Sequence, residues 1–229
     1  MVYKNKLQKI KEIAERKMKG IGPSHDFLHI MRVYNFCLLI AKNEKNVNLE
    51  VLKISALLHD IGGKKEILDK TGEINHAIVS AEIAERILKD LGYSEQKIEK
   101  IKHCISTHRF KGDARPKTIE AKILSDADKL DVSGAIGVVR SSCWIGENNA
   151  KIYSDIPLSE YIKENLVGGK SNGRIKDKSK HALNIEYEIK LKHISKRFFT
   201  KKAKEIAKER IKFMRQFFDR LKKEIKGRL

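Results

Sequence analysis

The chain has 229 residues, of which 41% are hydrophobic, and it carries a formal net charge of +19 at pH 7. It is long enough to bury a core as one domain, contains no apolar run of about 18 residues that could cross a membrane, and lacks the apolar segment of a secretory signal at its start. Three widely spaced cysteines exclude a disulfide framework and a zinc knuckle, so we expect a reduced, cytoplasmic protein with no membrane partner.

Two helices are predicted near the start of the chain. Residues 3–19 alternate basic and apolar positions at helical spacing, and the glycines and proline of residues 20–23 end this helix. Ser24 offers a side-chain oxygen that can cap the second helix. In that helix His29 and Val33 lie one turn apart on an apolar stripe, so we expect the His29 imidazole to face the core.

The third predicted helix has the composition of a buried central helix. Asn48 can cap it, and the side chains from Val51 to Leu58 are apolar or small almost all round. The helix runs into His59-Asp60, and Gly62-Gly63 then breaks it. We expect residues 64–72 to form a surface loop or short turn.

Further helical patterns follow along the chain. One helix is predicted from about residue 75 to residue 91, one from the cap Ser94 through His108, and one over residues 119–130. No segment shows sustained alternation with the period of a strand. The chain is therefore predicted to be all-α.

The last part of the chain divides into an irregular stretch and a long helix. Residues 144–180 contain Pro157, Gly168-Gly169 and many lysines, which predicts a long, partly mobile insertion. It would act as a lid over a phosphate site or stay a disordered linker. In the tail at residues 181–229, apolar side chains recur in steps of four and three from Ala207 to Ile225. We expect that stripe to pack against the core or to form the seam of a homodimer.

Most of the positive charge lies at the C-terminal end. From Lys170 to Leu229 there are 21 Lys and Arg against 7 Asp and Glu, a net charge of +14. A field of this sign attracts phosphate-bearing partners. Nucleic acid is therefore an expected alternative partner beside a small phosphate-bearing substrate.

Three motifs stand in order along the chain. The first, H-D-x-x-H-x-x-R-V, runs from His25 to Val33, the second is Leu57-Leu58-His59-Asp60-Ile61, and the third is D-A-D-K-L-D at residues 126–131, followed by G-A-I-G at residues 134–137. Together they resemble the HD-domain superfamily of metal-dependent phosphohydrolases, most closely its nucleotide-hydrolysing, pyrophosphohydrolase-like branch. The resemblance implies a multi-helix bundle forming a single domain over residues 1–229, with a metal-binding core at about 20–142.

The resemblance assigns metal-ligand roles to His29, His59, Asp60 and Asp128, and Asp60 is also a predicted catalytic residue. Asp128 takes this role because it is the acid immediately before the pair Lys129-Leu130, as in the family. Asp126 and Asp131 are left to cap helices or to hold a ligand histidine in its tautomer. Such a ligand set suits a divalent ion, Mn²⁺ or Mg²⁺ first, with Ni²⁺, Co²⁺, Fe²⁺ or Zn²⁺ as alternatives.

Further residues are expected to bind substrate or a second metal ion. The roles of His76, His103 and His108 stay open between a second metal and substrate contact, and His108 is also a candidate catalytic general acid. His25, one turn before His29, is a candidate for substrate contact or for support of a ligand. The basic candidates for phosphate binding are Lys64, Arg109, Arg115 and Arg140.

These features predict an enzyme. The first hypothesis is a phosphohydrolase that cleaves a phosphate ester or anhydride of a nucleotide or similar compound through a metal-activated water. No acid stands three residues after Asp60, which weakens assignment to the monophosphatase branch. The alternative enzyme is a phosphodiesterase acting on a cyclic nucleotide or RNA. The alternative from another class is a basic nucleic-acid-binding or regulatory protein with a structural metal.

Overall fold

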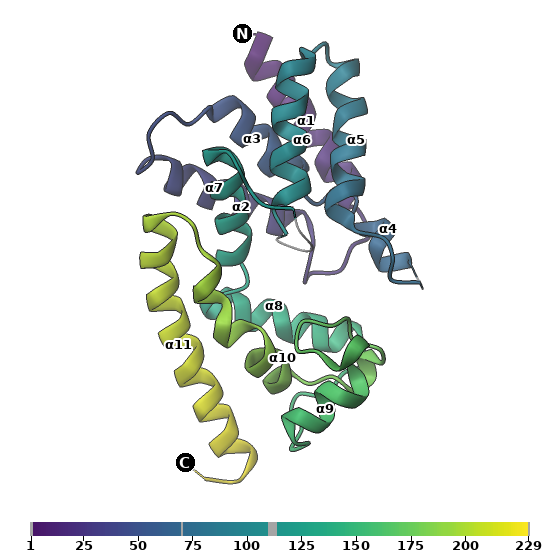
Figure 1. Ribbon diagram of the computed structural model, residues 1–229, viewed down its shortest axis with the longest axis vertical. Helices are drawn as coiled ribbons and strands as arrows, with labels where there is room; N and C mark the ends of the chain where they lie inside the picture. Colours follow the sequence, from purple (N-terminus) through teal and green to yellow (C-terminus); the bar gives the residue numbers. More distant parts are fainter. Residues whose placement is uncertain (1, 70, 110–113, 229) are drawn as a thin grey trace. The chain divides into compact units, whose positions relative to one another are not determined.

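The computed structural model describes residues 2–69, 71–109 and 114–228, and these residues contain helices and two isolated β-bridges but no strand (Figure 1). The all-α prediction is thus confirmed. None of the described helices is both long and apolar enough to cross a membrane. The helices are α1 Val2–Met18, α2 Phe27–Ala41, α3 Leu49–Leu58, α4 Gly63–Leu68, α5 His76–Asp90, α6 Glu95–Thr107, α7 Ile119–Leu130, α8 Gly134–Glu147, α9 Leu158–Asn165, the short η1 Val167–Gly169 and η2 Lys178–Lys180, α10 Leu183–Ile189, η3 Leu191–Arg197 and α11 Lys201–Ile225.

The chain forms two compact units. The first unit comprises Met1–Ile21, His25–Lys129 and Phe199–Ala203, and the second comprises Gly22–Ser24, Leu130–Phe198 and Lys204–Leu229. The first unit therefore holds α1 to α6 and nearly all of α7, and the second holds α8 to α10 and most of α11. The four predicted metal ligands all belong to the first unit.

Helix α3 is the central element of the first unit. It packs against α1, α2, α5 and α6, and Leu52, Leu57 and Leu58 are among its buried side chains. Asn48 caps it by accepting a hydrogen bond from the Val51 N–H at 3.1 Å, as predicted. Because each buried leucine contributes about 1.5–3 kcal/mol, α3 fixes the place from which His59 and Asp60 emerge.

Two local features differ from the sequence-based expectations. Ser24 does not cap α2, because its hydroxyl donates to the Glu147 carboxylate at 2.5 Å. Asp26 takes the cap position instead and accepts from the His29 N–H at 3.1 Å. The stretch at 64–72, predicted as a surface loop or short turn, contains α4. No glycine or proline follows Gly62-Gly63 before Gly72, so the chain can complete a helical turn there.

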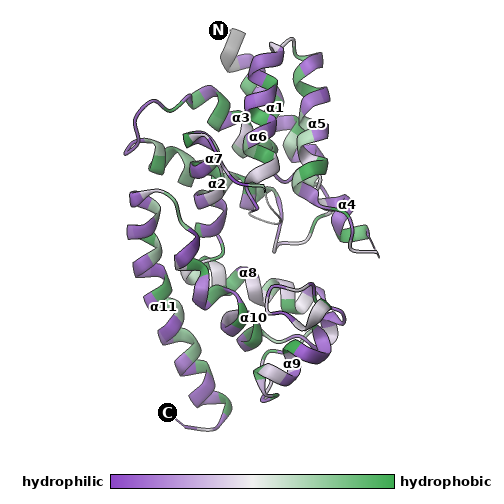
Figure 2. Ribbon diagram, in the orientation of Figure 1, coloured by the Kyte–Doolittle hydropathy of each residue, from purple (hydrophilic) through white to green (hydrophobic). Residues whose placement is uncertain are grey.

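Helix α11 buries its apolar stripe within the second unit. Met214 and Phe218 lie in a cluster with Leu183, Tyr187 and Leu191, and the rings of Tyr187 and Phe218 stack with centroids 4.1 Å apart. Figure 2 shows the resulting alternation of hydrophobic and hydrophilic residues along α11. The stripe therefore packs inside the chain, which was one of the two expectations for it. The homodimer stays a prediction.

The stretch at residues 144–180 holds more regular structure than its composition indicated. It contains α9, η1 and η2, and the side chains of Tyr161 and Leu166 are buried against Ala182 and Ile185. The Tyr161 hydroxyl and the His181 Nδ1 lie 2.6 Å apart. Apolar anchors near the middle of this lysine-rich stretch thus pack it into the second unit.

Asp126 joins α7 to the start of α11 inside the first unit. This buried carboxylate accepts hydrogen bonds from the Phe199 N–H at 2.9 Å, from the Thr200 N–H at 2.7 Å and from the Thr200 hydroxyl at 2.7 Å. Thr200 in turn caps α11, because its Oγ1 accepts from the Ala203 N–H. Of the two roles predicted for Asp126, the structure gives it that of anchoring a helix start.

Replacing Asp126 with alanine is expected to lower the free energy of unfolding by about 3 kcal/mol, because the substitution leaves several buried donors without an acceptor. Urea denaturation followed by circular dichroism measures the effect. Asp90→Ala, which removes an exposed carboxylate from α5, is the matched control. Equal denaturation midpoints for the two variants would contradict the prediction.

Candidate metal centre

The turn that carries His59 and Asp60 is held against α5 through Gly62. The Gly62 N–H donates to the Ser80 Oγ at 2.9 Å, and a Cβ on Gly62 would lie 2.8 Å from the Ser80 backbone nitrogen. Only glycine permits so close an approach. The pair His59-Asp60 is therefore fixed at the end of α3 by the packing of the next turn on α5.

Histidine and aspartate side chains from separate helices meet beside this turn. The His29 Nε2, from α2, lies 3.3 Å from Asp60 Oδ2, 3.6 Å from Asp128 Oδ1 on α7, and 3.3 Å from His59 Nε2. His29 and His59 are almost fully buried, whereas the Asp128 side chain is 23% exposed. The structure thus brings the four predicted metal ligands together, with Asp128 on the solvent side.

Two further histidines complete the cluster. The His76 Nε2, at the start of α5, lies 3.1 Å from Asp60 Oδ1, and the His108 Nε2, at the end of α6, lies 3.4 Å from the same oxygen. The two nitrogens are 3.4 Å apart. Asp60 therefore presents its Oδ2 to His29 and its Oδ1 to His59, His76 and His108.

The backbone fixes the tautomers of two of these histidines. The His59 Nδ1 lies 2.8 Å from the Ala56 carbonyl oxygen, and the His108 Nδ1 lies 2.6 Å from the Ile105 carbonyl oxygen. Since a carbonyl only accepts, each Nδ1 must carry the proton. An imidazole held by its Nδ1 in this way turns its Nε2 toward the cluster, which is the arrangement that metal-ligating histidines need.

The residues of the cluster fit a divalent metal ion. Asp60 Oδ1 is buried and accepts no hydrogen bond of acceptable geometry, although imidazole nitrogens lie 3.1, 3.4 and 3.7 Å away. A buried carboxylate oxygen without a hydrogen bond is costly, and a metal ion among these nitrogens would satisfy it. Two sets, His29 with His59 and Asp128, and His59 with Asp60 and His108, each bring their ligand atoms within 4.8 Å of one another.

Glu66, on α4, is a site residue that the sequence analysis missed. Its carboxylate contacts the His76 Nδ1 and accepts from the Arg109 guanidinium at 2.6 and 2.8 Å. Glu66 thus orients an imidazole of the cluster and also places a cation beside it. Glu66 lies six residues after Asp60, in a stretch whose composition predicts a surface loop or short turn, so no local pattern marks it as part of the site.

Lys129 supports the cluster from behind. This buried ammonium donates to the His108 carbonyl oxygen at 3.3 Å, to the Ser125 carbonyl oxygen at 2.9 Å and to the Ser125 hydroxyl at 2.5 Å. The Ser125 hydroxyl also donates to the His108 carbonyl oxygen at 2.8 Å. These bonds hold the end of α6 against α7, so that His108 and Asp128 keep their relative positions.

The buried charges of the cluster shift one another's pKa values. Burial raises the pKa of Asp60, but the attraction of His59 and His76 outweighs it and holds that pKa well below its usual range. Burial also raises the pKa of Asp128, but the attraction of His108 and His29 outweighs this effect and lowers that pKa to about 2. Both carboxylates are therefore ionised at neutral pH, as metal binding requires.

The histidines shift in opposite directions. Burial lowers the pKa of His59 to about 4. His76 is also buried, but the Asp60 and Glu66 carboxylates on either side of it raise its pKa to about 9. In the metal-free protein His59 is therefore neutral and His76 is cationic at pH 7, and metal binding by His76 would release a proton.

The metal-free protein is expected to lose stability on both sides of about pH 6.5. As the pH falls toward 4, the unfolded chain protonates His59 while the folded chain does not, and as it rises toward 9, the folded chain keeps a proton on His76 that the unfolded chain has lost. Thermal unfolding in a chelator over this range measures both effects. His76→Gln should abolish the alkaline decrease, and a decrease that persists in this variant would contradict the assignment.

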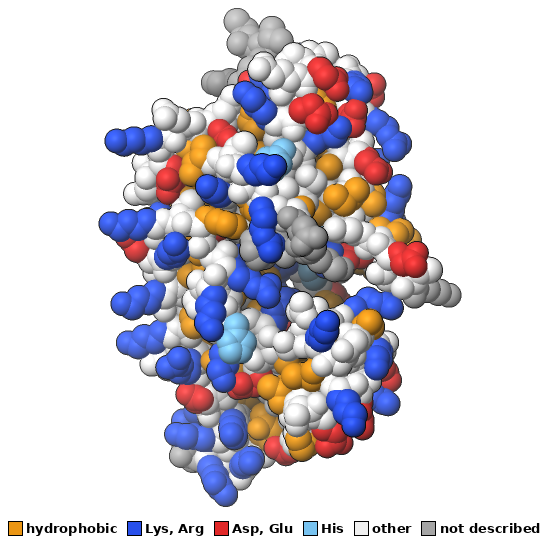
Figure 3. All heavy atoms as spheres, in the orientation of Figure 1, with side chains coloured by type: hydrophobic (Ala, Val, Ile, Leu, Met, Phe, Trp, Pro, Cys, Tyr) orange, Lys and Arg blue, Asp and Glu red, His pale blue; other side chains and the backbone are white. Residues whose placement is uncertain are grey.

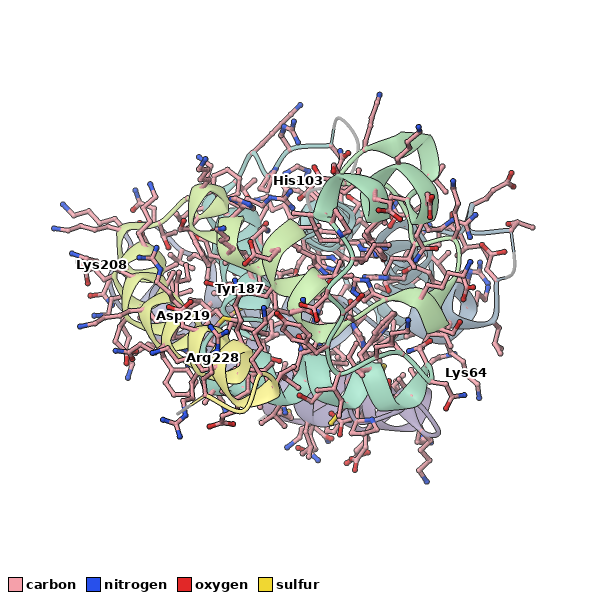
Figure 4. The ribbon with its side chains drawn as sticks, turned by 90° about the horizontal axis from the view of Figure 1, so that it is seen from below. Lys64, His103, Tyr187, Lys208, Asp219 and Arg228 are labelled. Atoms are coloured by element: carbon pink, nitrogen blue, oxygen red, sulfur yellow. The ribbon has the colours of Figure 1, made fainter. Side chains whose placement is uncertain are left out.

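The other predicted candidates do not belong to the cluster. The His103 Nε2 accepts the Lys117 N–H at 3.0 Å, which ties α6 to the segment before α7. Lys64 and Arg115 are exposed, and Figure 4 shows Lys64 and His103 well apart. His25 is exposed too, with its ring 6.3 Å from that of His29. Their roles in substrate binding stay predictions.

Arg140, a predicted phosphate ligand, is a buried residue of the second unit. Its Nε donates to the Ser24 carbonyl oxygen at 2.7 Å, and its Nη1 donates to the Asp131 carboxylate at 3.0 Å. These bonds give the guanidinium a structural role within that unit. They also show that the Asp131 carboxylate pairs with an arginine.

Comparison with known proteins identifies the stretch that carries the cluster. Residues 26–133 match the family model described as HD domain. The six histidines and aspartates of the cluster, from His29 to Asp128, all lie inside this match. A domain of this family implies divalent-metal binding, in agreement with the donor set.

Relatives extend the likeness over most of the chain. YpgQ of Bacillus subtilis is 27% identical over 207 residues, which is 89% of this chain and 85% of that protein. A crystal structure of YpgQ in complex with ADP gives a TM-score of 0.71 at 24% identity, covering 98% of this chain and 97% of that one. A predicted HD superfamily hydrolase from an uncultured Thermotogales bacterium gives 0.61 at 25% identity, covering 95% and 92%.

A more local likeness is to Ribonuclease Y of Chloroflexus aurantiacus. It is 37% identical over 102 residues, which is 43% of this chain but 17% of that protein. The likeness is therefore to one part of a much longer protein.

Proposed function

Since this chain belongs to the HD-domain superfamily, with its HD domain in residues 26–133, we propose that it is a metal-dependent phosphohydrolase that cleaves an ester or anhydride bond of a nucleotide. One observation carries the proposal. The Nε2 atoms of His59 and His108, whose Nδ1 atoms face backbone carbonyl oxygens, converge with His29 on the carboxylates of Asp60 and Asp128, and Asp60 has an oxygen without a hydrogen bond.

His29, His59, Asp60 and Asp128 would hold the metal ion, and Asp60, His76 and His108 offer ligands for a second one. When bound, a divalent ion supplies positive charge to a phosphoryl oxygen and makes water nucleophilic at neutral pH. Imidazole suits Mn²⁺ better than Mg²⁺, while carboxylate suits both. The mixed donor set therefore favours Mn²⁺ over Mg²⁺.

Arg109 supplies a cation for the substrate phosphate. The two bonds to Glu66 hold its guanidinium in place, yet its side chain remains 32% exposed. Because the same carboxylate contacts His76, Arg109 lies beside the metal ligands and not at an arbitrary point on the surface. A planar, permanently charged guanidinium in this place can bind a phosphate oxygen that the ligands do not reach.

His108 is better suited to bind metal or to accept a proton than to donate one. Its Nδ1 proton is directed at the Ile105 carbonyl oxygen, so the neutral ring has no proton on the Nε2 that faces the cluster. A general acid would have to carry a proton on that Nε2, which is the atom that a histidine ligand offers to a metal ion. We therefore assign His108 as a ligand or base.

A nucleotide is the proposed substrate because YpgQ, a relative over most of the chain, has been crystallised with ADP. The missing acid at the third position after Asp60 favours release of phosphate or pyrophosphate from a di- or triphosphate over attack on a monophosphate. The second candidate is a phosphodiesterase acting on RNA or a cyclic nucleotide, which the local likeness to Ribonuclease Y supports.

A substrate panel tests the proposal. Metal-stripped protein is supplied singly with Mn²⁺, Mg²⁺, Ni²⁺ or Co²⁺ and incubated with nucleoside mono-, di- and triphosphates, a cyclic nucleotide and a short RNA. We expect Mn²⁺-dependent release of phosphate or pyrophosphate that His59→Ala abolishes. Cleavage of RNA alone would favour the second candidate, and silence of the whole panel despite tight metal binding would overturn both.

A further inference from the structure

The positive charge of the chain is concentrated after α10. Residues 190–228 contain 16 Lys and Arg against 4 Asp and Glu. None of these cations belongs to the metal cluster, and an encounter with one small nucleotide does not require so many. The excess charge therefore calls for an explanation separate from hydrolysis.

On α11 the cations form a row. Lys204, Lys208, Lys212, Arg215 and Lys222 follow one another in steps of four, four, three and seven residues, which places them on one face of a helix. All five are exposed. Figure 3 shows Lys and Arg side chains standing along the edge that α11 occupies in Figure 1, and in Figure 4 Lys208 lies on the outer side of α11, away from Tyr187.

The row is held outward because the opposite face of α11 is buried. Ala207, Met214 and Phe218 are at most 6% exposed, and Met214 and Phe218 pack in the cluster with Tyr187. One acid, Asp219, falls on the face of the row between Arg215 and Lys222. Among the described residues, none of the five cations of the row forms an ion pair with a carboxylate, in contrast to Arg220, whose Nε pairs with Glu224 at 2.5 Å.

We propose that this row, Lys204 to Lys222 on α11, binds the phosphate backbone of a nucleic acid. The row spans about 27 Å at a rise of about 1.5 Å per residue, and a duplex of that length carries about 16 phosphates at one charge per about 1.7 Å. A straight array of cations matches a linear polyanion. No aromatic side chain lies in the row, so binding depends on the phosphate charges and not on the base sequence.

A lipid surface fits the row less well. Amphipathic helices bind membranes by inserting a free apolar face, and that face of α11 is covered by its own unit. The two large apolar side chains of α11 that are exposed, Phe213 and Ile225, are about 18 Å apart along the helix. They form no continuous apolar patch.

Binding of a fluorescein-labelled 20-base-pair DNA duplex, followed by anisotropy in a chelator over a series of salt concentrations, tests the proposal independently of any hydrolysis. The variant Lys204→Gln with Lys208→Gln and Lys212→Gln removes three charges from the row. Its matched control, Lys9→Gln with Lys17→Gln and Lys100→Gln, removes three exposed charges elsewhere. We expect the slope of log K against log salt to become shallower by about 2–3 in the row variant, and its affinity to fall at least about tenfold.

The control variant should bind the duplex within about twofold of the wild type, and the row variant should retain the wild-type thermal unfolding curve. Equal losses in the two triple variants would show an effect of net charge alone and overturn the proposal. So would absence of duplex binding at low salt, or binding to vesicles of phosphatidylglycerol and phosphatidylcholine with none to the duplex.

Discussion

Asp60→Asn is expected to abolish tight divalent-metal binding and to lower the rate of phosphate release by at least about 1,000-fold, equivalent to about 4 kcal/mol of barrier. The substitution keeps the shape of the side chain but removes the charge that faces His29, His59, His76 and His108. It also weakens the binding of a metal ion at any position in the cluster, because Asp60 lies in the middle of the donor set. Isothermal titration with Mn²⁺ and steady-state hydrolysis of a nucleoside triphosphate measure the two effects separately.

Asp90→Asn is the matched control for this variant, since Asp90 is an exposed carboxylate on α5 of the same unit. It should bind Mn²⁺ and hydrolyse substrate at the wild-type level. Wild-type Mn²⁺ affinity in Asp60→Asn would place the metal elsewhere. Lost hydrolysis with retained metal affinity would instead make Asp60 a base and remove it from the ligand set.

Glu66→Gln is expected to lower kcat/KM by about 10–100-fold, the range found when the partner of a ligand histidine is removed. The amide loses the charge that anchors Arg109 at 2.6 and 2.8 Å and that contacts His76. Loss of the first contact should raise KM, because Arg109 is no longer held for the phosphate. Loss of the second should weaken metal binding, since the charge that keeps the His76 ring oriented is gone.

Comparison with Arg109→Gln and with the double variant separates these two effects. If Glu66 acts only through Arg109, the double variant should be no worse than Arg109→Gln, whereas an additional loss of Mn²⁺ affinity identifies the contribution through His76. Glu73→Gln, an exposed carboxylate in the loop after α4, is the control. Kinetics of Glu66→Gln that match those of Glu73→Gln would refute the role assigned to Glu66.

The helices and the residues that meet in the cluster could be predicted because their signals are local. The apolar stripe of α2, the all-round apolar composition of α3 and the motif around His59 each occupy a short stretch of sequence. Glu66 could not be found in this way, because the residue that gives it a purpose, Arg109, is 43 positions away. A charged side chain in a six-residue helix looks the same in sequence whether it is solvated or holds a site together.

Arg140 shows the converse difficulty. A cation near a phosphohydrolase motif is a reasonable candidate for phosphate binding, and nothing local distinguishes it from one that is buried. Its partners are the Asp131 carboxylate, nine positions away, and the Ser24 carbonyl oxygen, 116 positions away. Folding brings such distant residues together, and only the tertiary structure shows that they are paired and buried.

The bonds from Phe199 and Thr200 to Asp126 bear on how this enzyme can be cut into parts. Asp126 stands two positions before the predicted ligand Asp128 on α7, and the residues that donate to it come from far beyond the stretch 26–133 that matches the family. A fragment ending near residue 133 would contain every histidine and aspartate of the cluster but would leave a buried carboxylate without its donors. The compact unit that holds the cluster is thus discontinuous in sequence, and we expect a fusion or truncation that preserves it to need the chain through Ala203.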